Sequence, residues 1–248
     1  MDTVQLVGLV VSGLAIGLML GTLGGGGAII TAPLLVFAFG LGVHEATTVS
    51  LVVVFLAAIS GLVGHARAGR VRWRSGIVFG LLGVVGAVPG AWLAGHVPES
   101  VLLAGFTLLL VVAAVAMWRG RVGTSSADRP TWLVAAVAVL VGLVIGFFGV
   151  GGGFVIVPAL VLFLGFPMPV AAATGLLVIA IDSVAALAVR GASSLDPAVA
   201  LPLALAAVVG SLVGARLAGR VPVEQLQRTF AVVMVLTAAG MGLRLAAV

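Results

Sequence analysis

The sequence predicts an all-α, polytopic membrane protein made of two inverted-topology repeats, each with about five hydrophobic segments. Three observations predict this fold class: a very apolar composition, glycine runs that interrupt two apolar segments, and arginines that change sides between the halves. The segments interrupted by glycine are expected to form broken or re-entrant half-helices. About eight to ten segments would then lie in the membrane.

The composition is too apolar for a soluble protein. Of 248 residues, 62% are hydrophobic and only 8% are charged, so the bilayer is the expected solvent. All twelve basic residues are arginines that lie between apolar runs, which indicates membrane topology and no nucleic-acid partner. The chain has no cysteine and three scattered histidines. It therefore offers no disulfide and no metal site, and neither a cofactor nor an enzyme activity is expected.

Each half of the chain contains the same order of apolar segments. In the first half they are 4–23, 28–39, 46–64, 75–94 and 101–118; in the second half they are 132–148, 154–164, 170–189, 198–218 and 226–245. Because about 20 helical residues span the hydrocarbon core, the second segment of each half is too short to cross alone. We expect a first membrane repeat in 1–120, a cytoplasmic linker in 121–130 and a second repeat in 131–248.

Glycine and proline positions recur between the halves. At an offset of 125 residues, the matches include Gly17 with Gly142, Gly21 with Gly146 and Pro33 with Pro158; at an offset of 124, Gly86 and Gly90 match Gly210 and Gly214. Apolar residues match by chance in such a chain, but ordered glycine and proline matches in two separate blocks indicate a duplication.

The arginines indicate that the second copy is inverted. The basic loop from His65 to Arg74 carries four arginines, so it is expected on the cytoplasmic side together with the linker. In the second half, the equivalent loop carries only Arg190, and the charge lies instead at Arg216, Arg220 and Arg228. The positive residues have moved to the opposite set of loops, as an inverted repeat requires.

The two glycine runs form the candidate binding site. They comprise Gly24, Gly25, Gly26 and Gly27 in the first half and Gly149, Gly151, Gly152 and Gly153 in the second. The short helix after each run would present free N–H groups and the positive end of its dipole, and glycine lets a ligand approach closely. An anion is the expected ligand. Close helix packing alone would explain isolated glycines, but not a run followed by a half-length helix.

Polar residues near the runs are candidates for anion contact: Thr47, Thr48, Ser50 and Thr174. Alternatively, these hydroxyls bond to their own helix backbone. Pro33 and Pro158 each free a carbonyl within a short helix, which either kinks the helix or leaves an oxygen for water or a coupling cation. Asp182 is the only acid deep in an apolar run. It would either serve coupling or gating, or make a structural hydrogen bond to Ser183 or a neighbouring helix.

The motif G-x-x-x-G-x-x-G-G-G-G-A-x-x-x-x-P from Gly17 to Pro33 is echoed from Gly142 to Pro158, and G-x-x-x-G-A-x-L-A-G occurs in both halves. These motifs resemble the TauE/SafE family of sulfite and sulfonate exporters, also called the 4-toluenesulfonate uptake permease family. The resemblance covers nearly the whole chain. It implies a secondary transporter of small sulfur oxyanions or sulfonates. The chain departs from the pattern at Gly27, and hydroxyls are sparser in the second half.

The residues and the resemblance together predict a secondary transporter in the cytoplasmic membrane. It would move sulfite, a sulfonate or a related anion by alternating access around a midplane site, coupled to a proton or ion gradient. The alternatives are a passive anion channel and a non-transporting membrane scaffold or regulator. The expected partners are the sulfur-containing anion and the lipid bilayer, and a homodimer is one candidate assembly.

Overall fold

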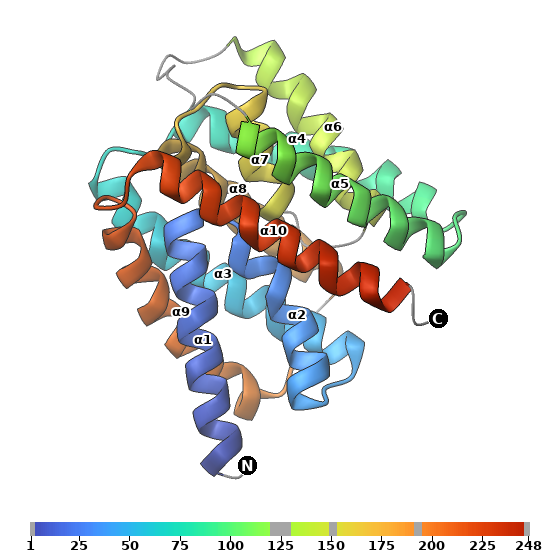
Figure 1. The fold of residues 1–248 in the computed structure, drawn as a ribbon, viewed down its shortest axis with the longest axis vertical. Coiled ribbons are helices and arrows are strands. Elements are labelled where there is room, and N and C mark those ends of the chain that lie inside the picture. The colour runs from blue at the N-terminus through green and yellow to red at the C-terminus, as the bar shows by residue number, and fades with distance from the viewer. Residues whose placement is uncertain (1–2, 120–129, 149–152, 191–194, 246–248) are drawn as a thin grey trace.

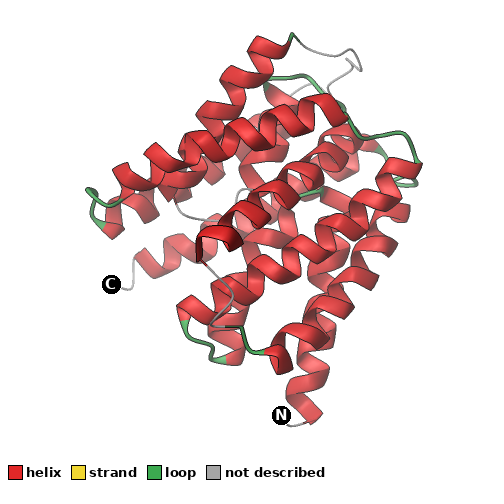
Figure 2. Cartoon of the chain, turned by 180° about the vertical axis from the view of Figure 1, so that it is seen from behind, coloured by secondary structure: helices red, strands yellow, loops and turns green. Residues whose placement is uncertain are grey.

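The computed structural model describes residues 3–119, 130–148, 153–190 and 195–245. These ranges contain helices and no strands (Figures 1 and 2). The helices are α1 (Thr3–Leu23), α2 (Gly26–Phe39), α3 (Val43–Arg67), α4 (Trp73–Ala94), α5 (Glu99–Arg119), α6 (Thr131–Phe148), α7 (Gly153–Leu162), α8 (Met168–Arg190), α9 (Pro197–Leu217) and α10 (Val223–Leu245). The expectation of an all-helical, polytopic membrane protein is confirmed.

Among the described residues, six helices are long and apolar enough to cross a membrane: α1, α3, α4, α6, α8 and α9. In contrast, α2 has 14 residues and α7 has 10, which correspond to about 21 and 15 Å of helix. These are the short helices expected after the glycine runs. They begin at Gly26 and Gly153, so the last glycines of each run belong to the first helical turn.

Helices of one half pack along helices of the other half. α1 lies along α9, and α6 lies along α4 (Figure 1). Glycines make these contacts close: a Cβ atom at Gly17 would overlap the backbone of Ala207, and one at Gly142 would overlap the backbone of Gly83. Such contacts bring helix backbones together in a membrane, where packing and not hydrophobicity drives helix association.

The contacts of the two halves are equivalent. Gly17 contacts Ala207, and Gly142 contacts Gly83. The two glycines are 125 residues apart and their two partners 124 residues apart, which are the two repeat offsets. Three other pairs join repeat equivalents directly: α2 packs against α7, α3 against α8 and α5 against α10. A two-fold relation between the halves accounts for all these pairs. The halves are therefore interlocked and do not form separate bundles.

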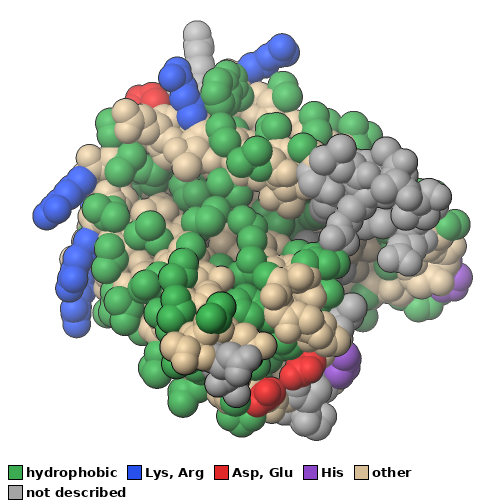
Figure 3. Space-filling model, turned by 60° about the horizontal axis from the view of Figure 1, so that its bottom comes forward, with side chains coloured by type: hydrophobic (Ala, Val, Ile, Leu, Met, Phe, Trp, Pro, Cys, Tyr) green, Lys and Arg blue, Asp and Glu red, His purple; other side chains and the backbone are tan. Residues whose placement is uncertain are grey.

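Arginine-bearing segments gather at one end of the bundle. Arg70, between α3 and α4, lies beside Gly219 in the turn between α9 and α10, because a Cβ atom at Gly219 would meet its guanidinium group. Arg228 at the start of α10 lies over the ring of Trp118 at the end of α5. Figure 3 shows arginines along the upper and left rim, with histidines and a group of acidic side chains at the lower right. A largely hydrophobic surface separates these groups in this view.

Candidate functional site

The first glycine run lies inside the protein. α1 ends at Leu23 and α2 begins at Gly26, and all four glycines between Leu23 and Ala28 are buried. Gly24 has a φ of 74°, a left-handed conformation that is strained for residues with a side chain. The unpaired backbone of this break is thus shielded from lipid, which is the condition for an interrupted helix at membrane depth.

The two glycine runs meet. A Cβ atom at Gly24 would overlap the backbone of Ala172 in α8, and one at Gly25 would overlap the carbonyl oxygen of Gly153. Conversely, a Cβ atom at Gly153 would lie 2.9 Å from the carbonyl oxygen of Gly25. The short helices α2 and α7 therefore begin against each other. The other predicted residues of the second run, Gly149, Gly151 and Gly152, lie outside the described residues.

The start of α2 has no side-chain cap. Its N-cap residue is Gly25, which can offer no side-chain acceptor to the first N–H groups of the helix. Ala28 donates its N–H to the carbonyl oxygen of Gly25 at 3.2 Å, while Gly26 and Gly27 are buried in the first turn. Each helix start carries roughly half a positive charge. A small anion placed between two such ends would accept hydrogen bonds from their N–H groups, and binding of an anion there stays a prediction.

The predicted hydroxyl residues divide between two locations. Thr48 is buried in α3, where its hydroxyl donates to the carbonyl oxygen of His44 at 3.0 Å. Thr174 is also buried, and its hydroxyl accepts from the N–H of Arg72 at 3.2 Å. Thr174 thus lies on the face of α8 towards α4, whereas Ala172 and Gly175 face Gly24. Contact between these hydroxyls and an anion stays a prediction.

The other residues of the predicted site lie within helices. Thr47 is half-buried and Ser50 is buried, both in α3. Pro33 lies inside α2 and Pro158 inside α7, so each short helix contains the proline expected from the sequence. Coupling roles for the prolines stay a prediction.

Asp182 lies in α8, three residues after Ile179, whose Cδ1 atom is 2.9 Å from the Cβ position of Gly153. One carboxylate oxygen of Asp182, Oδ1, is buried and has no hydrogen-bond partner among the described residues. The repeat equivalent in α3 is the buried Ala57 or Ala58. The acid therefore makes α8 chemically different from its repeat equivalent α3 at this position.

The prediction that His65 lies in the basic loop is wrong. His65 does not begin the basic loop, because α3 continues to Arg67 and His65 is fully buried. Its Nε2 atom donates a hydrogen bond of 2.8 Å to the carbonyl oxygen of Gly21. In a continuous helix that carbonyl would accept from the N–H of Gly25, and the break removes this hydrogen bond. His65 thus satisfies a free carbonyl at the end of α1 and stabilises the first break.

A sequence signal for His65 was present. Gly61 and Gly64 precede it, and both face other helices: Gly61 lies beside Ser211 and Gly21, and Gly64 lies beside Ala215. A histidine next to glycines that permit close helix packing is expected to be buried and hydrogen-bonded. The prediction instead grouped His65 with the arginines that follow it from Arg67 to Arg74.

Comparison with known proteins identifies the family. The family model described as sulfite exporter TauE/SafE matches residues 9–241. The chain belongs to this family. It is similar to a probable membrane transporter protein of Xylella fastidiosa (strain Temecula1), with 34% identity over 239 residues, covering 92% of this chain and 91% of the relative. No solved structure was found to match the chain.

More distant TauE/SafE relatives carry the same description. A probable membrane transporter protein of Methanocaldococcus jannaschii is 29% identical over 187 residues, covering 72% of this chain and 70% of the relative. Another, from Bacillus subtilis, is 27% identical over 206 residues, covering 71% and 74%. The predictions of a membrane transporter and of a multi-pass protein in the cell membrane are confirmed.

Proposed function

We propose that this TauE/SafE protein is a secondary transporter of a small sulfur-containing anion, such as sulfite or a sulfonate. The observation that carries the proposal is that α2 and α7 begin against each other, in buried positions, at the two glycine runs. The family description supplies the class of anion. Coupling to a proton or ion gradient is part of the proposal.

The binding site would consist mainly of backbone. Clustered N–H groups from the first turns of α2 and α7 suit an oxyanion with three oxygens, because hydrogen bonds to a charged acceptor are short and strong. Hydroxyls of Thr47 and Ser50 in α3 would supply further donors, whereas Thr48 would have to exchange its bond to the carbonyl oxygen of His44 for one to the anion. Glycine at Gly25 and Gly153 lets the two helix starts approach each other closely, so that N–H groups of both could reach one ligand.

Each of the two moving units would contain helices from both halves of the sequence. The close contacts of Gly17 and Gly142 join α1 to α9 and α6 to α4, so one unit contains α1–α3 with α9 and the other contains α6–α8 with α4. In the membrane, the two halves would have opposite orientations, consistent with arginines gathered at one end of the bundle. If each unit adopted the conformation of the other, the site would close to one side of the membrane and open to the opposite side.

Transport assays with purified protein in liposomes test this proposal. We expect saturable uptake of sulfite, and faster entry of labelled sulfite into vesicles preloaded with unlabelled sulfite. Such counterflow requires a carrier that reorients with its ligand bound. Flux that rises linearly with concentration, without counterflow, would favour the passive channel. Absence of both flux and ligand-induced thermal stabilisation, across sulfite and short sulfonates, would favour the scaffold.

Replacing Asp182 by asparagine will separate coupling from transport. If the carboxylate carries the coupling proton, Asp182→Asn will lose accumulation driven by a proton gradient but keep counterflow, because the amide cannot exchange a proton. Asp196→Asn is the matched control: Asp196 caps α9 by accepting from the N–H of Ala198 at 2.9 Å, and asparagine caps equally well. Gradient-driven accumulation at the wild-type level in Asp182→Asn would contradict a coupling role.

A further inference from the structure

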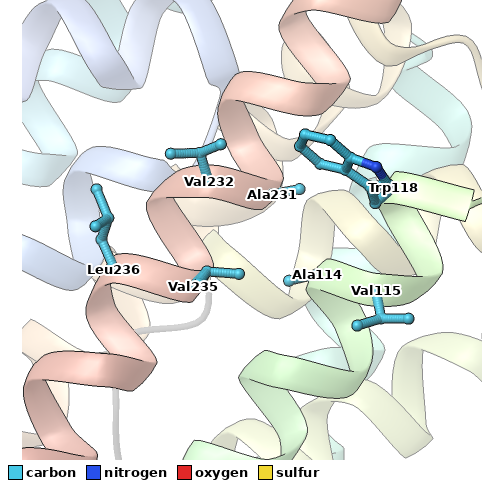
Figure 4. A pocket seen from close by; sticks show the side chains of 7 residues that line it. All are labelled: Ala114, Val115, Trp118, Ala231, Val232, Val235 and Leu236. Carbon is cyan, nitrogen blue, oxygen red and sulfur yellow. The ribbon is translucent and has the colours of Figure 1, made fainter.

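An apolar groove lies between α5 and α10 (Figure 4). Its volume is about 300 Å³, and its lining residues are Ala114, Val115, Trp118, Ala231, Val232, Val235 and Leu236. Several of these side chains are exposed although they are large and apolar, with Trp118 at 58% and Leu236 at 66%. Exposed apolar side chains of a membrane protein are the kind of surface that lipid chains cover.

Cationic side chains border one end of this groove. The guanidinium carbon of Arg228 lies 5.8 Å from the centroid of the Trp118 ring, and Arg119 follows Trp118 in the last turn of α5. Both arginines are exposed. The acid on this stretch, Glu224, lies one turn before Arg228 and forms no ion pair with it among the described residues. The groove therefore combines apolar walls with two exposed arginines near one end.

We propose that this groove binds an anionic phospholipid. Its acyl chain would lie against Val115, Val235 and Leu236, and its phosphate would contact Arg228 and Arg119. Trp118 would lie at the level of the headgroup, where tryptophan side chains concentrate in membranes. Arginines at the edge of the bilayer attract anionic headgroups by about 1 kcal/mol each.

The charge distribution argues against a second copy of the chain as the occupant. In a two-fold dimer whose axis follows the membrane normal, this face would meet itself at the same depth. Arg119 and Arg228 of one protomer would then approach those of the other. Like charges in contact are unfavourable in a low-dielectric surrounding, whereas a lipid phosphate neutralises them.

The lipid would bridge the last helices of the two halves. α5 and α10 are repeat equivalents that pack against each other, and Gln227 of α10 donates from its side-chain amide to the carbonyl oxygen of Met117 in α5. An anionic lipid across this contact would stabilise the pair independently of the transported anion. This proposal therefore stands whether or not sulfite is the substrate.

Native mass spectrometry can test the site with phosphatidylglycerol and phosphatidylcholine of identical acyl chains. The wild-type protein is expected to retain phosphatidylglycerol preferentially and to melt at a higher temperature in its presence. The double variant R119Q/R228Q should lose at least about tenfold in phosphatidylglycerol retention, equal to about 1.4 kcal/mol. The control is Arg74→Gln, an exposed arginine at the start of α4, which should retain the lipid.

Three outcomes would overturn the proposal. One is equal retention of the two lipids by the wild-type protein, which requires no variant and so does not depend on folding of the double mutant. Another is an equal loss of retention in Arg74→Gln, which would indicate general surface charge. The third is a dimer, without bound lipid, that becomes tighter in R119Q/R228Q, where the repulsion between the arginines is removed, which would show that the groove is occupied by a second copy.

Discussion

Replacing Gly26 by alanine will reduce anion transport at least about tenfold while the protein stays folded. A Cβ atom at Gly26 would have ordinary contacts with Leu23, Met19 and Val233, at 3.5 to 3.8 Å. Alanine also favours helix over glycine by up to about 1 kcal/mol. The added methyl group would lie at the first turn of α2, beside the N–H groups that we assign to the anion. Transport of labelled sulfite into liposomes and thermal unfolding measure the two effects.

Gly42→Ala is the matched control for this experiment. Gly42 is the N-cap residue of α3 with a φ of −60°, and a Cβ atom there would meet nothing within 4 Å. We expect wild-type transport and stability for this variant. Gly25→Ala is expected to behave differently from both, because its Cβ atom would overlap the carbonyl oxygen of Gly153 and should destabilise the fold. Wild-type transport by Gly26→Ala, with unchanged apparent affinity, would show that the start of α2 does not bind the anion.

Replacing Gly142 by alanine will destabilise the protein, whereas Gly83→Ala in the same helix contact will not. A Cβ atom at Gly142 would overlap the carbonyl group of Gly83, so α6 and α4 would have to separate. The Cβ position of Gly83 is open, with its nearest neighbour at 3.9 Å. Overpacking of this kind costs about 1–3 kcal/mol and sometimes more. Thermal unfolding in detergent should show a lower melting temperature for Gly142→Ala alone.

The repeat equivalent extends this test to the first half. Gly17→Ala should destabilise the protein as Gly142→Ala does, because its Cβ atom would overlap the backbone of Ala207 in the equivalent contact of α1 with α9. If either glycine tolerates alanine without loss of stability, the close contacts between the halves are not required. The proposal that the moving units cross the halves would then lose its basis.

The interlocked arrangement also explains why the glycines occur in two blocks. Gly17 and Gly21 face the carbonyl oxygens of Ala207 and Ser211, so a single helix contact requires glycine at two successive turns. The glycine runs also make close contacts, of Gly24 with Ala172 and of Gly25 with Gly153, but they differ in lying where helices end and begin.

Local features of the sequence determined the helices of this protein. Apolar length predicted the long helices, and the glycine runs predicted that α2 and α7 would be short, because both features act within a single segment. The repeat offsets of 125 and 124 residues recurred in the contacts, because duplicated segments keep duplicated packing surfaces. The family resemblance depended on these same glycines and prolines.

Only the tertiary structure decided which faces meet. The segments are apolar all round, so their sequences carry no amphipathic signal that reveals a buried face. The contact of Gly25 with Gly153, the orientation of Thr174 towards Arg72, and the bond of His65 to Gly21 all depend on helix rotation and on partners far along the chain. Composition and spacing determined that two helix breaks exist. Packing between the interlocked halves determined that the breaks lie against each other.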